Sequence, residues 1–258
     1  MTGLLSVAGS TPSEGFELKS CRFDGGSSSY LRKVFSTSAD RRTWTYSLWA
    51  KPCRFSGTNQ AILYAGSDEF EVYFYSTKLK VYTKAAVILE TTAVYRDPSS
   101  WYHIVLAVDT TQGTAADRVK LYINGDQVTA FGTANYPAQN LEWDVGHSVQ
   151  HNIASWDTDD EFYDGYLAEV YMINGSQLTP AYFGETNAAT NRWQPIEPSK
   201  IKPTVTFGMN GFYLPFSNDA LATSFTDSAE GIIITPNSTT HTDTTIKKIG
   251  TASAQFAP

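Results

Sequence analysis

The sequence predicts an all-β protein built as an antiparallel sandwich or barrel. Nine short segments are rich in β-branched and aromatic residues, turn residues separate them, and helical periodicity is almost absent. Charged residues make up only 17% of the 258 residues, whereas we count 54 serines and threonines. That balance is typical of sheets whose outer faces carry hydroxyl groups. The aromatic content of 14% excludes a disordered chain, and the length suits one large β domain with an appendage.

The nine predicted strands follow one another with Gly, Asn, Asp or Ser between them. They cover residues 16–23, 43–51, 61–65, 70–75, 78–83, 101–109, 118–123, 141–145 and 165–173. In the second of them, Trp44, Tyr46 and Leu48 alternate with hydroxyl residues. Because neighbouring side chains of a strand point to opposite faces, this alternation predicts one buried face and one face in solvent.

Two nearly repeated segments, 121–129 and 171–179, each end a strand at an Asn-Gly pair. Asn-Gly tolerates the positive φ angles of a type I′ turn, so each pair predicts a hairpin or a strand exit. The second copy ends in Thr-Pro-Ala-Tyr-Phe-Gly at 179–184. The N-cap threonine, the proline at the first position and the final glycine predict a single helical turn there.

A proline-rich stretch divides the chain. Pro195, Pro198 and Pro203 lie within nine residues, and we expect such a stretch to join neither a helix nor a central strand. The expected organisation is an N-terminal arm at 1–15, a sandwich at 16–194, a linker at 195–204 and a C-terminal extension or docking arm at 205–258. The extension has short apolar runs, and two alternatives stay open: it folds alone or it completes a partner's sheet.

Charge and hydropathy exclude several functions. A net charge of −7 offers no basic field to attract nucleic acid phosphates or anionic lipids, so we expect no nucleic acid partner. The apolar runs are far shorter than the ~20 residues that a membrane span needs, which predicts no membrane insertion. The first 15 residues lack the basic start and the apolar stretch of a secretory signal.

Three stretches resemble the core motifs of laminin-G-like, concanavalin-A-like domains. Residues 101–109 (Trp-Tyr-His-Ile-Val-Leu-Ala-Val-Asp) with 119–125 are similar to the central strand pair of that family. Residues 164–174 with 178–183 are similar to its closing strand and small helix. Residues 43–50 are similar to its early strand. These stretches fall in the family's order within residues 16–194. The resemblance implies a jelly-roll sandwich.

A second resemblance concerns residues 184–186, 193–195 and 211–217, which look like the tail of laminin-G-like proteins of marine tailed bacteriophages. In those phages such domains belong to tail fibres or to the capsid surface. The resemblance implies a non-catalytic structural protein of the virion surface, made in the host cytoplasm without a signal peptide. Its partners would be other virion proteins or copies of itself, together with host-surface glycans. Capsid or tail location, oligomeric state and glycan identity stay open.

The same fold family includes glycoside hydrolases of the laminarinase type, which deliver two carboxylates from one strand in a Glu-x-Asp-x-x-Glu pattern. The nearest match here is Glu142, Asp144 and His147, so a histidine stands where the acid/base belongs. We therefore expect no catalytic residues, and a hydrolase remains an alternative only if another carboxylate lies opposite Glu142 or Asp144. His103, inside a strongly apolar strand, is expected to have a core or edge role.

The window 156–164 carries five acidic residues in eight positions. Calcium takes six to eight oxygen ligands, and such a loop can supply several of them. Laminin-G-like domains often bind calcium at the sandwich rim, although the spacing here matches no EF-hand loop. The alternative is a solvated loop. The candidate calcium ligands are Asp157, Asp159, Asp160, Glu161 and Asp164.

Aromatic residues flank the same window. Flat aromatic faces beside carboxylates that bind hydroxyl groups are typical of sugar recognition. The candidate glycan-binding residues are Trp156, Tyr163, His147 and His151, which give the second functional hypothesis, a lectin-like carbohydrate-binding module assisted by calcium. The alternative is that these rings pack at the rim of the sandwich.

Overall fold

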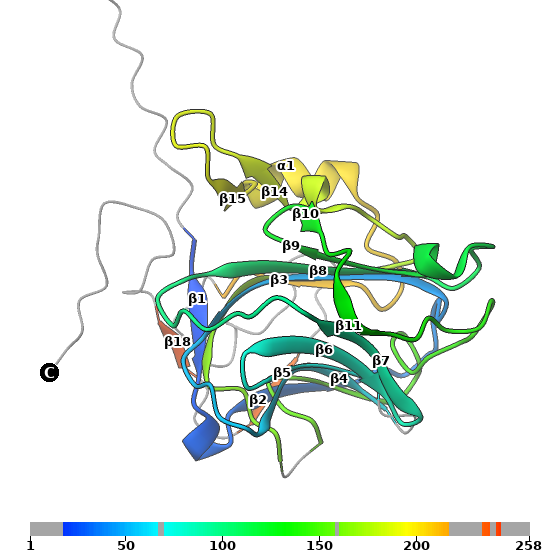
Figure 1. Cartoon of the computed structure of the whole chain (residues 1–258), viewed down its shortest axis with the longest axis horizontal. Helices are drawn as coiled ribbons and strands as arrows, with labels where there is room; N and C mark the ends of the chain where they lie inside the picture. Colours follow the sequence, from blue (N-terminus) through cyan, green and yellow to red (C-terminus); the bar gives the residue numbers. More distant parts are fainter. Residues whose placement is uncertain (1–17, 67–69, 158–159, 217–233, 238–240, 244–258) are drawn as a thin grey trace, which may run out of the picture.

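The computed structural model describes residues 18–66, 70–157, 160–216, 234–237 and 241–243. Two antiparallel sheets face each other across one core, as Figure 1 shows, which confirms the all-β sandwich. The expected N-terminal arm at 1–15 lies outside the described residues, and so do 217–233, 238–240 and 244–258 of the expected extension. In the part of the chain that is described, no helix is long and apolar enough to cross a membrane.

The first sheet has the strand order β10-β9-β8-β3-β13-β1-β18, and β16 also pairs with β13. Its strands are β1 (Ser20–Phe23), β3 (Thr43–Pro52), β8 (Tyr102–Asp109), β9 (Val119–Ile123), β10 (Asp126–Gln127), β13 (Gly165–Asn174), β16 (Phe212–Leu214) and β18 (His241–Asp243).

The second sheet has the order β11-β7-β6-β5-β4-β12-β2-β17. Its strands are β2 (Tyr30–Val34), β4 (Asn59–Ala65), β5 (Phe70–Tyr75), β6 (Lys78–Thr83), β7 (Ala86–Thr91), β11 (Phe131–Ala134), β12 (Gln150–Ile153) and β17 (Thr235–Asn237). A separate ladder joins β14 (Gly184–Thr186) and β15 (Trp193–Pro195). The short helical segments are η1 (Gly25–Ser27), η2 (Ala115–Asp117), η3 (Pro180–Tyr182), α1 (Pro198–Ile201) and η4 (Lys202–Thr204).

Eight of the nine predicted strands are present, and the prediction for 141–145 is wrong. This segment is a loop whose Trp143 and Val145 are buried in the core. Apolar and acidic residues alternate here as in a strand, but three consecutive residues are buried and the loop is held by the Arg41 segment instead of by a ladder. The Trp143 amide donates to the Arg41 carbonyl, and the Arg41 guanidinium donates back to the Trp143 carbonyl.

The predicted alternation along β3 is confirmed, but the expectation that one face lies in solvent is wrong. Trp44, Tyr46 and Leu48 point into the core between the sheets. Thr45 and Ser47, on the opposite face, are also fully buried. Burial on both faces follows because the chain beyond β13 returns over the outside of the first sheet. The apolar contacts there join Val105, Ala107, Tyr122, Tyr171, Ile173, Phe183, Ile201, Val205, Phe207 and Tyr213.

The stretch at 195–204 does include a helix, contrary to expectation. Pro198 opens α1, a position where the missing amide hydrogen costs nothing, and η4 follows directly. Ile201 of α1 is buried against the outside of the first sheet. The segment therefore packs on the sandwich, and Figure 1 shows α1 beside β14 and β15 on that side.

Trp193 of β15 attaches the β14-β15 ladder to the first sheet. Its Nε1–H donates to His103 Nδ1 at 2.9 Å, and the two rings stack with centroids 5.9 Å apart. On its other face His103 stacks on Trp49, with centroids 4.7 Å apart. Because Nδ1 accepts, Nε2 carries the hydrogen that points at Ser47 Oγ, 3.0 Å away. The core role expected for His103 is confirmed, since 1% of the residue is exposed.

A bulge in β13 places a carboxylate in contact with β16. Glu169 has φ +49° and lies where the pairing of β13 with β3 shifts register. Its buried carboxylate Oε2 accepts hydrogen bonds from the hydroxyls of Tyr171 and Tyr213, each at 2.9 Å. The two tyrosine rings stack with centroids 4.3 Å apart. The bond from Tyr213 joins β16 to β13, and the stacked Tyr171 shares the same carboxylate.

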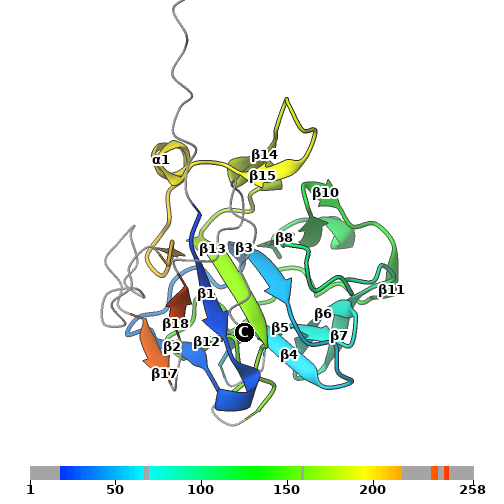
Figure 2. The same ribbon diagram turned by 90° about the vertical axis from the view of Figure 1, so that its left-hand side faces the viewer.

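The described strands at the end of the chain complete this chain's own sheets. β17 pairs with β2 at one edge of the second sheet, and β18 pairs with β1 at one edge of the first. Figure 2 shows the two strands on the same side of the sandwich. Ile234, just before β17, is buried in the core. One short segment thus covers an edge of each sheet, where unpaired backbone groups would otherwise be exposed.

Candidate functional site

The outer face of the second sheet carries polar and aromatic side chains. Along β5, Phe70, Val72 and Phe74 point into the core. The residues between them, Glu71 and Tyr73, therefore point outward. The neighbouring strand β6 adds Tyr82, which pairs with Glu71 across the ladder. Because the returning chain covers the first sheet, this face of the second sheet is the one that can present such side chains to a ligand.

A groove of about 280 Å³ lies on this face, between strands β4 to β6 and the loop that joins β12 to β13. Its volume is close to the lower limit of ordinary small-molecule sites. Three aromatic rings, two carboxylates and one amide converge there. Its lining residues are Asn59, Glu71, Tyr73, Tyr82, Trp156 and Glu161.

Asn152 organises the loop that forms the wall of the groove. It is fully buried in β12, and its Nδ2 group donates to Ser155 Oγ at 3.1 Å, to the Trp156 carbonyl at 2.9 Å and to the Asp157 carbonyl at 2.8 Å. Ala154 begins the turn with φ +73°, a conformation that such a tight set of contacts imposes. The position of the Trp156 backbone therefore depends on one buried amide.

The far end of the loop is held by a bulge in β4. The Ala61 amide, at the point where β4 shifts register against β5, donates to the Glu161 carbonyl at 2.9 Å. Glu161 has φ +56°, and its Oε1 accepts from Asn59 Nδ2 at 2.6 Å. Its Oε2 is buried and has no hydrogen-bond partner among the described residues. The loop therefore brings a carboxylate oxygen without a protein partner to the groove.

The two carboxylates of the groove affect a neighbouring tyrosine. Glu71 is 2% exposed, so its charge is poorly screened by solvent. Burial raises the pKa of Tyr73 well above its ordinary value, and the charges of Glu71 and Glu161 raise it further. Tyr73 therefore keeps its hydrogen and can donate or accept a hydrogen bond over the whole accessible pH range.

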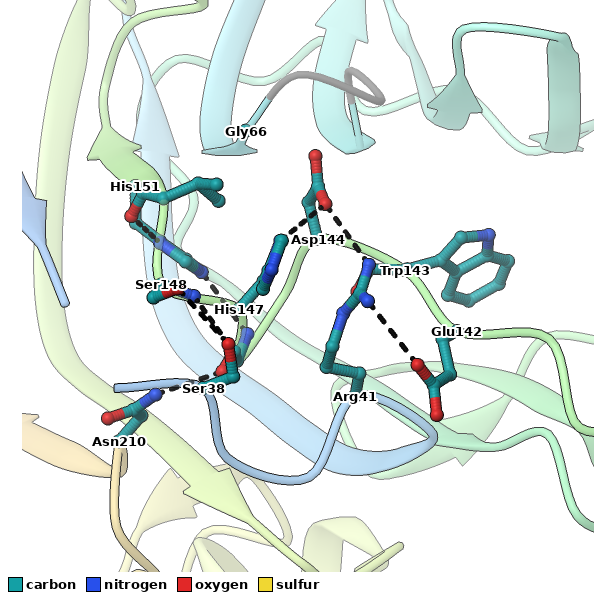
Figure 3. Close-up of polar contacts among 12 residues, drawn as sticks. Ser38, Arg41, Gly66, Glu142, Trp143, Asp144, His147, Ser148, His151 and Asn210 are labelled. Atoms are coloured by element: carbon teal, nitrogen blue, oxygen red, sulfur yellow. Dashed lines mark hydrogen bonds and ion pairs between the residues drawn. The ribbon is translucent and has the colours of Figure 1, made fainter. Parts of the chain in front are cut away.

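A second pocket, of about 470 Å³, lies at the loops around Arg41, and Figure 3 shows its polar contacts. Arg41 lies between two carboxylates, with Nη1 3.3 Å from Glu142 Oε2 and Nη2 3.2 Å from Asp144 Oδ1. His147 Nδ1 lies 3.2 Å from the same Asp144 oxygen. The side chain of Asp144 is 1% exposed and that of Glu142 is 47% exposed. The two carboxylates share one arginine and differ sharply in their access to solvent.

His151 lies beneath this pocket, with its ring edge-on to Phe35 at 4.9 Å. The Gly146 amide donates to Nε2, and Nδ1 faces the Val149 carbonyl at 3.0 Å, so the ring is neutral with its hydrogen on Nδ1. Burial lowers the pKa of His151 from 6.5 to about 4, and the charge of Asp144 opposes this shift in part.

We expect the protein to lose stability between pH 6.5 and pH 4. In that interval the unfolded chain protonates His151 and the folded chain does not, so falling pH favours unfolding, and the effect of this group ends near pH 4. The full loss is about 3 kcal/mol. Urea unfolding at pH 7 and pH 4.5 measures it. The variant His151→Gln should flatten the pH dependence.

The predicted glycan-binding residues do not lie together. Trp156 lines the groove, and its ring is edge-on to Tyr64 at 6.1 Å. Tyr163 is fully buried and packs on Phe74, so its ring cannot reach a ligand, and the prediction for it is wrong. His147 lines the second pocket, and buried His151 lies beneath it.

The predicted calcium ligands are also separated. Asp164 forms an ion pair with Arg22 at 2.6 Å, Asp157 Oδ1 accepts from Gln150, and exposed Asp160 accepts from the Glu161 amide. Asp159 lies outside the described residues. Within the described residues, no three acidic, histidine or cysteine side chains form a group that could hold a metal ion.

Sequence reasoning missed Asn59, Glu71, Tyr73 and Tyr82. A signal was present in the predicted strands 70–75 and 78–83, where Glu71, Tyr73 and Tyr82 occupy alternate positions between core residues. Alternate positions of one strand point to one face, so these three residues identify an outer surface. The pattern contains neither the register between strands nor the fold of the loop. The register and the loop together bring Trp156 and Glu161 beside these three residues.

Comparison with known proteins gives a family and a fold. The family model described as the concanavalin A-like lectin/glucanases superfamily matches residues 24–181. No curated protein matches the sequence at a significant level. Among solved structures, a Bacteroides ovatus protein provisionally described as carbohydrate-binding is similar, with a TM-score of 0.60 and 14% identity. The match covers 88% of this chain and 60% of that protein, so this chain spans well under two thirds of its length.

Two further solved structures are similar over part of this chain. A SAP-like pentraxin of Limulus polyphemus, which is heptameric, is 16% identical over 64% of this chain and 79% of its own, with a TM-score of 0.45. Domains LG4-5 of the mouse laminin alpha1 chain are 12% identical over 60% of this chain and 41% of theirs, with a TM-score of 0.41.

Proposed function

Because the chain belongs to the concanavalin A-like lectin/glucanases superfamily, we propose that it is a non-catalytic glycan-binding protein whose site is the groove beside Trp156. The observation that carries this proposal is the convergence of three aromatic rings with carboxylate and amide groups in a groove on the outer face of the second sheet. The Bacteroides ovatus protein of the same fold, provisionally described as carbohydrate-binding, is consistent with it.

A sugar ring offers an apolar face of C–H groups and a rim of hydroxyl groups. The exposed part of the Trp156 ring suits the first, and the hydroxyls of Tyr73 and Tyr82 with the Asn59 amide suit the second. A mostly preformed groove with a few fixed polar groups is the usual form of such sites. The chain's own contribution is therefore stacking and hydrogen bonding, without a covalent step.

The arrangement of carboxylates supports the absence of catalysis. A glycosidase needs two carboxyl groups that both reach the scissile bond. In the groove, Glu71 is 2% exposed and Glu161 Oε1 is engaged by Asn59. In the second pocket, Arg41 forms ion pairs with both Glu142 and Asp144, and the latter is buried. Incubation of the protein with laminarin and other β-glucans should therefore release no reducing ends.

Replacement of a ring in the groove tests the proposal. We expect Trp156→Ala and Tyr82→Ala each to weaken binding to a glycan found on an array by at least about tenfold, because each removes a stacking surface. Tyr182→Ala removes a ring that is 40% exposed on η3, outside the groove, and should leave the affinity unchanged. Calorimetric titration of the three variants measures this. Equal loss in all three, or an array on which nothing binds, contradicts the proposal.

A second candidate function is a structural role at a virion surface, with other virion proteins or further copies of the chain as partners. It rests on the resemblance of 184–186, 193–195 and 211–217 to phage proteins, and two of these stretches pack within the fold. Trp193 is stacked on His103, and Phe212–Leu214 forms β16. The two roles are compatible, since a surface protein can hold its glycan groove outward.

Purified particles test the virion role. Cryo-EM, or labelling of native particles with an antibody against the chain, should find it in regular positions on the shell or in a few copies at the tail. The first result supports a capsid-surface protein and the second a receptor-binding protein. Absence of the chain from particles contradicts the virion role and leaves the glycan proposal standing.

A further inference from the structure

An exposed tyrosine continues the groove beside Trp156 along the outer face of the second sheet. We propose that the site binds a chain of several linked sugars rather than one terminal sugar, and that the ring of Tyr75 stacks on a sugar beyond the groove; this inference rests on the proposed function. Tyr75 is not one of the groove-lining residues, and 42% of it is exposed. The groove and this ring together form a longer binding surface than the groove alone.

The strand register places Tyr75 directly beside the groove. It lies opposite Asn59 across the β4-β5 ladder, and along β5 it follows Tyr73 by two positions, so its side chain shares a face with both. Asn59 and Tyr73 both line the groove. Opposite side chains in an antiparallel pair have Cβ atoms about 5 Å apart, and alternate residues of a strand are about 7 Å apart. The ring therefore adjoins the end of the groove that Asn59 forms.

The row of outward side chains on β5 is longer than one sugar ring. Glu71, Tyr73 and Tyr75 occupy alternate positions, and the first and last of them are about 13 Å apart along the strand. Trp156 lies at the Glu71 end, because its ring is edge-on to Tyr64, the residue opposite Glu71 in β4. A ligand that contacts the aromatic rings at both ends of the row must therefore contain several linked sugars.

A lysine and an ion-pair network hold the Tyr75 ring from one side. The ammonium of Lys80 lies 4.6 Å from the ring centroid, which is within cation–π range. The same ammonium lies 3.1 Å from Glu90 Oε2, and Lys78, opposite Tyr75 in β6, lies 2.7 Å from Glu90 Oε1. The exposed part of the ring remains for the apolar C–H face of a sugar. A ring that is fixed before binding loses less conformational entropy when the ligand stacks on it.

A series of glycans of increasing length tests the inference. The probes are gluco-, galacto- and manno-oligosaccharides with α or β linkages, in chains of one to six sugars, titrated calorimetrically into the full chain. For a sugar type that binds, we expect the affinity to rise at least about fivefold from the disaccharide to the tetrasaccharide, because only the longer chain reaches the Tyr75 ring. From the pentasaccharide to the hexasaccharide it should change by less than twofold.

The variant Tyr75→Ala should remove this gain with length. We expect it to lower the affinity for the tetrasaccharide and the hexasaccharide at least about fivefold, and to change binding of the monosaccharide and disaccharide by less than twofold. Tyr75→Phe keeps the ring and should bind every length as the unaltered chain does. Tyr182→Ala removes a ring of similar exposure on η3, outside the groove, and should change the affinity for no length.

The outcomes separate this inference from the function on which it rests. Equal loss at every length in Tyr75→Ala would show a structural role for this ring and overturn the inference. A gain with length that Tyr75→Ala leaves unchanged, or no gain beyond the disaccharide, also overturns it. In each of these cases the glycan groove stands if Trp156→Ala still weakens binding at all lengths. If no glycan of any length binds, both fall.

Discussion

The variant Asn152→Asp should abolish glycan binding and lower the free energy of unfolding by at least about 3 kcal/mol. The amide of Asn152 donates to Ser155 Oγ and to the carbonyls of Trp156 and Asp157. A carboxylate in its place would face three oxygens with no hydrogen to offer, in a fully buried position. The loop would have to leave its site, and it carries Trp156 and Glu161 out of the groove. Urea unfolding and calorimetric titration measure the two effects.

Asn210→Asp is the matched control. Asn210 is also buried, and its amide donates to the carbonyls of Thr37 and Gly146, each at 2.9 Å, away from the groove. The same substitution there should reduce stability by a similar amount but leave binding intact at temperatures where the variant is folded. If Asn210→Asp also eliminates binding, loss of fold rather than loss of the loop explains both results.

The second large effect concerns Gly125, which we expect to tolerate alanine far less well than Gly175 does. Both glycines follow an asparagine in the repeated motif and have positive φ, +94° and +99°. Alanine at either position costs about 1 to 2 kcal/mol in backbone strain. At Gly125 the new Cβ would also lie 2.8 Å from the ring of Trp193, whereas at Gly175 no atom is within 4 Å. Overpacking adds about 1 to 3 kcal/mol, so Gly125→Ala should cost about 2 to 5 kcal/mol.

A double-mutant cycle isolates the ring contact. In a Trp193→Ala background, Gly125→Ala should cost no more than Gly175→Ala, because the obstructing ring is gone and backbone strain alone remains. Chemical denaturation of the four variants gives the coupling energy. A coupling near zero would mean that Trp193 does not press on the Asn-Gly turn, and that the two glycines differ for another reason.

The Asn-Gly pairs are features of the fold that a few adjacent residues are enough to predict. Asn124 and Gly125 both have positive φ and connect β9 to β10, as a type I′ turn requires. The other pair ends β13 as a strand exit. The helical turn after Thr179 is also confirmed, as η3, although Gly184 begins β14 and Phe183 caps the turn. Such features depend on a few adjacent residues, so the sequence carries them directly.

The predictions that failed depend on distant contacts. Apolar and acidic residues alternate over 141–145 as they do in a strand. The segment is held instead by a hydrogen bond from the Arg41 side chain, and no local pattern predicts that contact. Pro198 was expected to exclude a helix, but it is the first residue of α1. The five acids near Trp156 suggested one metal site, whereas Asp164 is held by Arg22, which lies 142 residues away along the chain.

The sequence by itself determined the all-β class and eight of the strands, because period-two patterning, turn residues and composition act within a few positions. Tertiary structure alone decided which face of the sandwich is open. The returning chain buries Thr45 and Ser47, while β5 and β6 leave Glu71, Tyr73 and Tyr82 beside the loop. The pairing of β12 with β4, in which Asn152 lies opposite Tyr64, brings the loop beside these residues from 88 positions away in the chain.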